Sequence, residues 1–391
     1  MASQAWQAHW QQLRQDKQQQ QSWRQMHIRQ WPSAQLDFIC NDYLGLARSR
    51  LMRLALAEGA RRYGAGAGSS PMLQGYFSSH QQLAAELASW LGRDSCLLFS
   101  SGYAANLALM QSFARFSQRT FLDHSCHASL VDGLAFAPQN WRRYPHLRLD
   151  ILEQWLARGE AAQRRLVVSE TLFSMDGDQL PAQQMARLTQ QHQALLILDD
   201  AHGIACTGAQ AKGICADLDQ QQAPLVMGSL AKALGGAGAF VVGPTELLQT
   251  VQQLARPLVY STALSPAMAY ASRQALAYVQ QQPQLQADLQ ANIQHFRQGA
   301  KHYGLPLLAV GGPIQALILQ QNARALAWAA QLEKQGILVA AIRPPTVGPN
   351  QARLRISISA QHSRAQIEQL LEALNDLQRQ EAEALTLEAQ P

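Results

Sequence analysis

The segment Ser229-Leu230-Ala231-Lys232-Ala233-Leu234-Gly235-Gly236-Ala237-Gly238 places a lysine just after an apolar run. That run, Pro224-Leu225-Val226-Met227, predicts a buried strand, so Lys232 is expected on the turn at its carboxyl end. Lys232 is one of five lysines, and it alone follows such a strand and precedes a glycine cluster. Because glycine lacks a Cβ, the cluster predicts that a flat ligand can approach the backbone here.

A second apolar run, Leu195-Leu196-Ile197-Leu198, ends at Asp199, and His202 follows three residues later. A carboxylate at the end of a buried strand is costly unless it meets a cation. An amine that forms a Schiff base and an acid that pairs with a pyridinium nitrogen are the groups that pyridoxal phosphate (PLP) chemistry requires. The two segments therefore predict a PLP site, with Lys232 as the amine, Asp199 as the acid and His202 as a donor to the phenolic oxygen.

The middle of the chain alternates short apolar runs with amphipathic helical patterns. Runs without internal alternation predict strands buried on both faces and joined by parallel crossovers; they lie at 96–99, 166–168, 195–198, 224–227 and 239–242. Residues 353–359 instead alternate strictly, so Leu354, Ile356 and Ile358 should face a core while the arginines face solvent or the rest of the protein. We expect an α/β protein with a mostly parallel sheet in a large domain and a smaller α+β C-terminal domain.

The same patterns divide the chain into four segments. We expect an N-terminal helical segment at 1–45, a large cofactor-binding domain at 46–280, a small C-terminal α+β domain at 281–380 and a frayed tail at 381–391.

The composition and charge of the chain restrict the classes of partner that it is expected to bind. The 391 residues are 47% hydrophobic and 15% charged, with a net charge of +5. The arginines are dispersed, which argues against nucleic acid, and no apolar run approaches the ~20 residues that span a membrane. Five scattered cysteines without a CxxC pair predict a reducing cytoplasm. An anionic small substrate or an acidic carrier protein is compatible with the charge.

Further residues fit the cofactor hypothesis. Ser100-Ser101-Gly102-Tyr103 lies between an expected strand and helix, where a helix N-terminus suits a phosphate, and Tyr103 is placed near the ring. His124 and His127 are three residues apart without further ligands, which is a poor zinc site, so no metal is expected. His127 is better interpreted as a lid over a conjugated ring. Ser174 is a candidate hydrogen-bond partner of the cofactor.

These motifs, taken together, resemble the α-oxoamine synthases, PLP-dependent transferases of fold type I (aspartate-aminotransferase-like). The matching segments run in order along the chain: 41–46, 101–106, 127–129, 173–178, 199–203, Lys232, 353–355 and 360–362. The resemblance therefore extends from about residue 20 to residue 375.

The resemblance implies roles for individual residues. Lys232, His127 and Asp199 would be catalytic, with His127 stacked on the ring. The other residues expected to contact the cofactor are Gly102, Tyr103, Ser174, His202, Ser229, Ser261 and Thr262. Among these, Ser261 and Thr262 lie on a loop that reaches the neighbouring subunit's phosphate, which implies a homodimer with shared active sites. Asn41, His127 and Arg355 would bind the amino acid, and Arg24 and Thr346 would lie by the acyl group.

Residues 341–347 most resemble the biotin-biosynthesis branch of this family. That branch implies an acyltransferase that joins L-alanine to the acyl group of pimeloyl-CoA or a pimeloyl-carrier protein and releases CO2 and the free thiol. Two alternatives stay open: a sister activity on glycine or serine with another acyl-CoA, and a non-catalytic regulatory paralogue.

Overall fold

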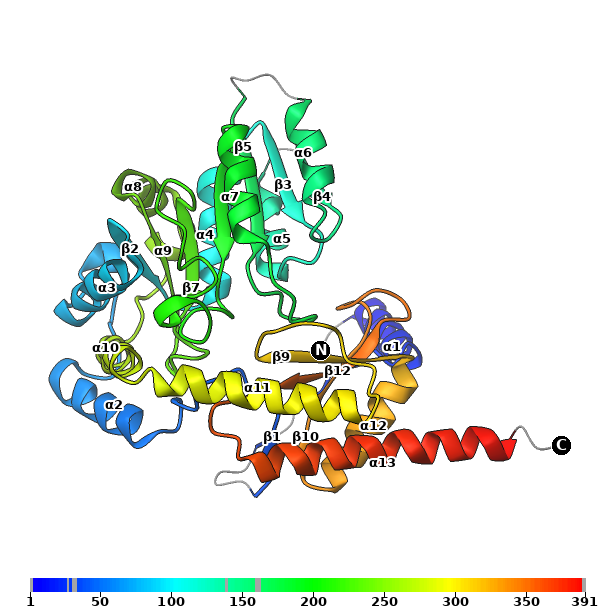
Figure 1. The fold of residues 1–391 in the computed structure, drawn as a ribbon. Helices are drawn as coiled ribbons and strands as arrows, with labels where there is room; N and C mark the ends of the chain where they lie inside the picture. The colour runs from blue at the N-terminus through cyan, green and yellow to red at the C-terminus, as the bar shows by residue number, and fades with distance from the viewer. Residues whose placement is uncertain (1–2, 27, 30–33, 138–139, 159–162, 389–391) are drawn as a thin grey trace.

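A seven-stranded sheet forms the centre of the large domain in a computed structural model, which describes residues 3–26, 28–29, 34–137, 140–158 and 163–388 (Figure 1). The strand order is β2-β8-β7-β6-β5-β3-β4. The strands are β2 Ser95–Phe99, β3 Arg119–Asp123, β4 Trp141–Tyr144, β5 Arg165–Glu170, β6 Leu195–Asp199, β7 Leu225–Ser229 and β8 Ala239–Gly243.

The sheet is parallel except for β8, which pairs antiparallel with both β7 and β2. Only the segment from Leu230 to Gly238 connects β7 to β8, and it is too short for a parallel crossover, which needs a dozen or more residues. The expected α/β large domain with a mostly parallel sheet is confirmed. Strands β3 and β4 were not predicted, because β3 has only two consecutive apolar residues and the aromatic residues of β4 are separated by two arginines.

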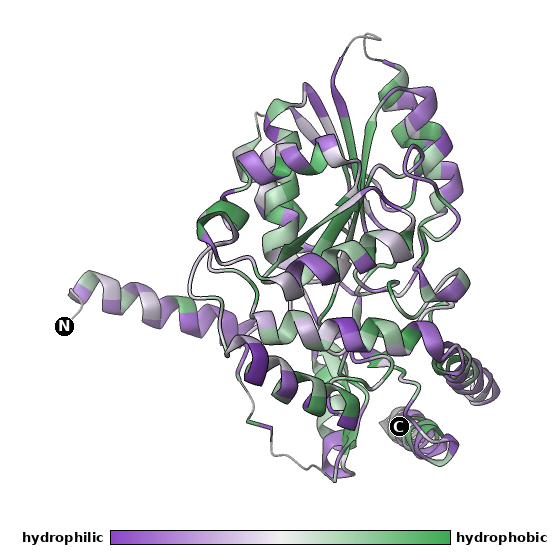
Figure 2. Ribbon diagram, turned by 90° about the vertical axis from the view of Figure 1, so that its left-hand side faces the viewer, coloured by the Kyte–Doolittle hydropathy of each residue, from purple (hydrophilic) through white to green (hydrophobic). Residues whose placement is uncertain are grey.

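Helices cover both faces of this sheet. Alternate strand residues join two separate cores: Val167, Leu196 and Leu198 pack with α3, α6 and α7, whereas Leu166, Val168 and Ile197 pack with α4, α5, α8 and α9. Burial on both faces explains the continuous apolar runs, and Figure 2 shows the central part of the sheet as mostly hydrophobic. The helices are α1 Gln4–Gln19, α2 Arg50–Tyr63, α3 Ser78–Leu91, α4 Gly102–Phe113, α5 Ala128–Gly133, α6 Leu149–Ala157, α7 Ala182–Gln191, α8 Thr245–Leu254, α9 Arg256–Val259, α10 Pro266–Gln281, α11 Gln284–His302, α12 Asn322–Lys334 and α13 Arg364–Glu388, with short 3-10 helices at η1 Pro71–Leu73, η2 Ala114–Phe116, η3 Leu134–Phe136 and η4 Ala209–Ala211.

A three-stranded antiparallel sheet, β11-β12-β9, forms the small domain. Its strands are β9 Ile314–Gln320, β11 Ala340–Ile342 and β12 Ala352–Ser357, and a two-stranded parallel sheet joins β1 Leu36–Asp37 to β10 Ile337–Leu338. On β12, Leu354 and Ile356 are buried in the core, as predicted. Arg353 and Arg355 are also buried, because their face of the sheet contacts the large domain rather than solvent.

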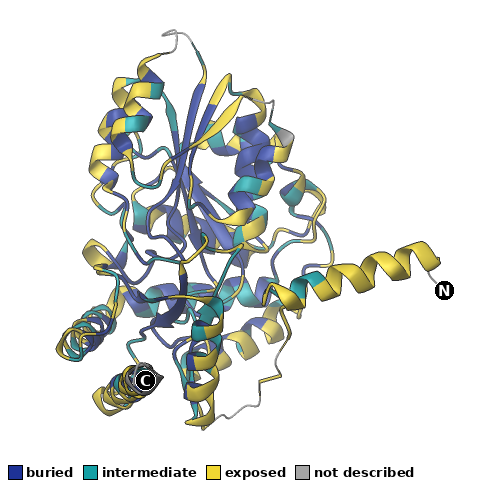
Figure 3. Cartoon of the chain, turned by 90° about the vertical axis from the view of Figure 1, so that its right-hand side faces the viewer, coloured by how far each residue is buried: buried dark blue, intermediate teal, exposed yellow. Residues whose placement is uncertain are grey.

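The two terminal helices extend from the body. Helix α1 has no buried residue and projects away from the rest of the protein, as Figure 3 shows by its exposed surface. Helix α13 runs to Glu388, while residues 389–391 of the expected tail lie outside the described residues. Among the helices described, none has both the length and the apolar character to cross a membrane. The four-segment division of the chain stays a prediction.

Candidate active site

Lys232 lies on the turn between β7 and β8, at the carboxyl end of the parallel strands. Burial lowers the pKa of its amine to about 8, the carboxylates of Asp199 and Glu170 oppose that shift, and Arg355 adds to it. The glycines after Lys232 pack against other segments of the protein, whereas the sequence predicted that they let a ligand approach the backbone. Gly235 has a φ of +66° and an added Cβ would lie 2.4 Å from the backbone nitrogen of Ala47, so the cluster lets two protein segments pack closely rather than admitting a ligand.

Two carboxylates face this amine from neighbouring strands. Asp199 ends β6 and is 6% exposed; its Oδ1 accepts from Ala201 N at 2.9 Å and its Oδ2 from Asn106 Nδ2 at 2.8 Å. Glu170 ends β5 and is 2% exposed. Burial and the charge of Asp199 raise the pKa of Glu170 well above its usual range, although Lys232 opposes this. Glu170 Oε1 also accepts from the backbone N–H of His127, so both carboxylates have hydrogen-bond donors that stabilise their charged forms.

His127 is held by a chain of hydrogen bonds that begins at Asp199. Asn106 Nδ2 donates to Asp199 and also to Ser129 Oγ at 2.9 Å, and Ser129 Oγ lies 2.7 Å from His127 Nδ1. The backbone N–H of Ser129 donates to the same Nδ1 at 3.2 Å. Because a backbone N–H can only donate, Nδ1 is an acceptor and the proton of the neutral ring is on Nε2. Desolvation lowers the His127 pKa, which keeps the ring neutral, though Asp199 opposes it.

A second chain of hydrogen bonds joins His202 to the expected carboxylate site. The Tyr43 hydroxyl lies 2.7 Å from His202 Nδ1 and 3.2 Å from Asn41 Oδ1, which also accepts from Arg355 Nη2 at 2.9 Å. His202 is buried, and desolvation followed by the charge of Lys232 lowers its pKa well below the usual value. The Tyr43 hydroxyl donates to Asn41 Oδ1, and its contact with Nδ1 fixes the orientation of the His202 ring in the site.

Arg355 reaches this cluster from the small domain. Its Nε donates to the carbonyl of Ser174 at 2.6 Å and its Nη1 to Ser357 Oγ at 3.0 Å. Ser174 lies in the turn after β5, so one guanidinium links the two domains beside Lys232. A buried arginine whose donors are fixed by neutral acceptors keeps its positive charge for an anionic ligand.

Three more predicted residues surround the amine. Gly102 and Tyr103 begin α4, whose N-cap Ser101 accepts from Ala104 N at 3.1 Å. The Tyr103 ring lies edge-on to His127 at 6.3 Å between centroids, and its hydroxyl bonds to Asp132. Ser229 Oγ accepts from Ala231 N at 3.1 Å. The helix N-terminus, the amine of lowered pKa and the strand-end carboxylate fit a PLP phosphate, aldehyde and ring nitrogen.

Four predicted residues lie away from this cluster. Arg24 Nη2 donates to Thr346 Oγ1 at 2.9 Å, so the two residues expected near the acyl group contact each other across 322 positions of sequence. Ser261 and Thr262 are exposed on the loop after α9, and within the described part of the chain neither side chain bonds to another predicted site residue.

Several residues of the site had no predicted role. Asn106 and Ser129 lie inside the matched motifs, and an amide on an otherwise apolar helix was the available signal. Glu170 carries the signal used for Asp199, an acid that ends an apolar strand. Tyr43 gave no local signal, because its contact with His202 joins residues 159 positions apart.

Comparison with protein families gives a match to aminotransferase class I and II over residues 33–374. Among curated relatives, the 8-amino-7-oxononanoate synthase of Methylococcus capsulatus (strain ATCC 33009 / NCIMB 11132 / Bath) is 44% identical over 349 residues, which cover 89% of this chain and 90% of that protein. The 8-amino-7-oxononanoate synthase of Chromohalobacter salexigens is 42% identical, with 92% and 94% covered.

Solved structures are likewise similar to the chain over most of its length. A serine palmitoyltransferase from S. paucimobilis with bound PLP is similar with a TM-score of 0.84 and 27% identity, covering 88% of this chain and 87% of that one. The 8-amino-7-oxononanoate synthase of Francisella tularensis has a TM-score of 0.77 and 28% identity, covering 89% and 99%.

Proposed function

The chain belongs to the aminotransferase class I and II family, and from this we propose that it is a PLP-dependent 8-amino-7-oxononanoate synthase of biotin biosynthesis. The reaction is the condensation of L-alanine with a pimeloyl thioester, which gives 8-amino-7-oxononanoate, CO2 and the free thiol. The observation that carries the proposal is the name shared by its curated relatives over most of their length. The strand-end pair of Lys232 and Asp199 supplies the chemistry that such a reaction needs.

The cofactor would be held by residues from several strand ends. Lys232 would bind its aldehyde and Asp199 its ring nitrogen, His202 would donate to its phenolic oxygen, and the start of α4 with Ser229 would receive its phosphate. Bound PLP supplies an electron sink for the negative charge that develops at the amino acid's Cα.

The chain's own groups perform the proton transfers. Lys232 Nζ, with a pKa of about 8, is partly neutral at physiological pH and can take the Cα proton. Arg355 and Asn41 orient the substrate carboxylate, which fixes the Cα–H bond relative to that base. His127 presents its Nε2–H, because Nδ1 already accepts two hydrogen bonds, so it can stabilise a developing oxyanion on the acyl carbonyl.

We place the acyl chain beside the bonded pair Arg24 and Thr346, where the small domain meets the segment after α1. The donor is pimeloyl-CoA or a pimeloyl-carrier protein, and both are anionic. Arg343, whose Nε donates to the carbonyl of Gln21 at 2.8 Å, adds a cation to this entrance.

We also propose a homodimer with shared active sites and a cytoplasmic location. Tyr260, which directly follows α9, is 72% exposed, and Leu73 of η1 is 71% exposed. Because α9 and η1 pack together, they give an apolar surface next to Ser261 and Thr262. In a homodimer that covers this surface, the loop with Ser261 and Thr262 of one subunit would reach the phosphate site of the other subunit. All five cysteines are free thiols, as in reducing compartments. Analytical ultracentrifugation that gave only monomers at micromolar concentration would contradict the dimer.

One experiment tests the reaction and separates it from the sister activity, to which the serine palmitoyltransferase fold points. Purified holoenzyme is given L-alanine, glycine or L-serine with pimeloyl-CoA, a pimeloyl-carrier protein or palmitoyl-CoA, and thiol and CO2 release are measured. Turnover confined to L-alanine with a pimeloyl thioester supports the proposal, whereas preference for serine with palmitoyl-CoA would replace it. A protein that fails to bind PLP would indicate the non-catalytic paralogue.

A further inference from the structure

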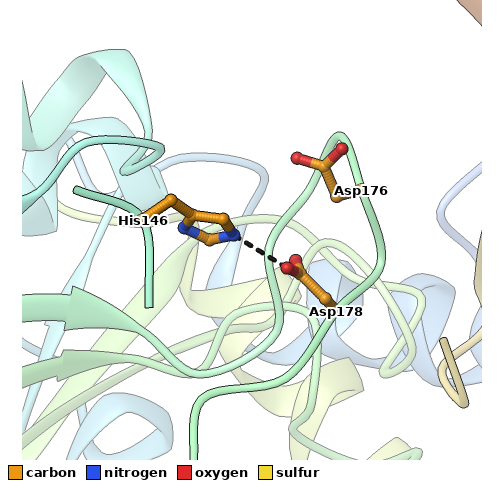
Figure 4. A group of neighbouring side chains, drawn as sticks. All are labelled: His146, Asp176 and Asp178. Carbon is orange, nitrogen blue, oxygen red and sulfur yellow. Dashed lines mark hydrogen bonds and ion pairs between the residues drawn. The ribbon is translucent and has the colours of Figure 1, made fainter. Parts of the chain in front are cut away.

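His146 lies outside the predicted site, between two carboxylates. It follows β4, and its Nδ1 lies 2.8 Å from Asp123 Oδ1. Its Nε2 lies 2.7 Å from Asp178 Oδ2, the contact drawn in Figure 4. Asp123 ends β3 and is fully buried, whereas Asp178 lies in the turn after β5. The imidazole also packs edge-on against Phe173 at 4.4 Å between centroids. One ring therefore joins the loops that follow two adjacent strands.

Both loops lead to the active site. Asp123 Oδ1 also accepts from Ser125 N at 2.8 Å, which shapes the short loop that ends at His127. The other loop is the turn 173–178, and its Ser174 carbonyl receives Arg355 Nε.

The turn 173–178 is also held by the small domain. Asp176 forms an ion pair with Arg353 of β12, and Gly177 has a φ of +78° with no room for a Cβ beside the carbonyl of Ile314. His146 and β12 thus both hold the turn 173–178 in position. Movement of the turn would displace the Ser174 carbonyl and with it the guanidinium of Arg355.

The charges favour a cationic ring. Burial lowers the pKa of His146, but the hydrogen bonds and charges of Asp123 and Asp178 outweigh this and raise it to about 10. Asp176 and Arg353 are the next charged groups facing this cluster, and the buried Tyr144 lies on the same strand connection. His146, Asp176 and Asp178 are close enough to hold a metal ion, yet both ring nitrogens already contact carboxylates and Asp176 contacts Arg353, so ion pairs account for the contacts of His146 and Asp176. Asp178 Oδ1 is buried and has no partner in the part of the chain that the structure describes.

We propose that His146 is a positioning residue for the amino-acid carboxylate site: it fixes the turn 173–178 so that the Ser174 carbonyl orients Arg355. This inference rests on the proposed function, because L-alanine is taken as the ligand of Arg355. The inference gives the His146 side chain a function in substrate affinity. The sequence did not indicate this function, because His146 lies apart from every site motif.

The test compares His146→Gln, which keeps a polar side chain without the charge, with His295→Gln as a matched control. His295 pairs with Glu368 at 3.3 Å in the small domain, away from the site. L-Alanine is titrated into each holoenzyme, and its dissociation constant is read from the absorbance change of bound PLP. We expect H146Q to bind L-alanine about tenfold more weakly, or about 1.4 kcal/mol, with PLP and thioester affinity within about twofold of wild type, and H295Q to match wild type.

The pH profile separates positioning from simple packing. The ratio of the H146Q to wild-type dissociation constants should fall from about tenfold near pH 7.5 toward one as the pH approaches 10, because the wild-type ring then loses its proton. If H146Q does not fold, Asp178→Ala replaces it with the same expected result, since it removes the acceptor by which His146 holds the turn.

Equal L-alanine affinity in wild type and these variants would overturn the inference, as would stoichiometric zinc binding that H146Q abolishes. A wild-type protein that binds PLP but not L-alanine would instead count against the proposed function.

Discussion

Asn106→Leu tests the hydrogen-bond chain that sets the orientation of Asp199 and His127. Asn106 is 1% exposed on α4, and its Nδ2 donates both to Asp199 Oδ2 and to Ser129 Oγ. A bond to a charged acceptor contributes about 1.5–3 kcal/mol and a neutral one about 0.5–1.5 kcal/mol, which together give a loss of about 3 kcal/mol. Asn106 Oδ1 is buried without a partner among the described residues. Its removal therefore relieves a desolvation cost and offsets about 1 kcal/mol of that loss. The net expected loss is about 2 kcal/mol.

Two measurements check this value. Urea unfolding of the cofactor-free protein gives the change in unfolding free energy, and titration with PLP gives the cofactor dissociation constant. We expect N106L to bind PLP about tenfold more weakly, because Asp199 keeps only the Ala201 N–H as a fixed donor. Ser112→Ala is the control, since its hydroxyl bonds only to the carbonyl of Ala108 in the same helix. An N106L variant with wild-type unfolding free energy and PLP affinity would refute the assignment.

Three further predictions follow from the same geometry. Arg355→Ala should weaken L-alanine binding at least about tenfold while PLP binding changes little, as read by the two titrations; equal losses for both ligands would remove Arg355 from the carboxylate site. The condensation rate at saturating substrates should rise with pH through about 8 and then level off, because the base must be neutral and the pKa of Lys232 is lowered to about 8; a rate that falls over this range would exclude Lys232 as the base. Gly177→Ala should lower the unfolding free energy by at least about 1 kcal/mol, since its φ is +78° and the new Cβ would meet Ile314 O; a urea midpoint equal to that of wild type would contradict this packing.

The strand ends show what sequence can predict. Lys232 and Asp199 were placed together because the carboxyl ends of parallel strands meet at one edge of a sheet. Strict alternation on β12 likewise predicted which side chains enter the core. These arguments use only local patterns, and the residues that they name lie at the strand ends where they were predicted.

Other features depend on contacts between distant segments and gave no local signal. The partners of His146 are defined only once β3, β4 and β5 lie side by side. The same holds for Tyr43, which reaches His202 from a segment outside the large sheet. The glycines after Lys232 were misinterpreted because the segment that packs against them lies far earlier in the chain, at Ala47.

The central claim is that Lys232 is the amine that binds the PLP aldehyde. Reduction of the holoenzyme with borohydride followed by proteolysis and mass spectrometry identifies the modified residue. We predict one stoichiometric phosphopyridoxyl group on the peptide that contains Lys232, with none on the peptides of Lys17, Lys212, Lys301 or Lys334. Modification of another lysine, or of none in a protein that has bound PLP, would contradict the account.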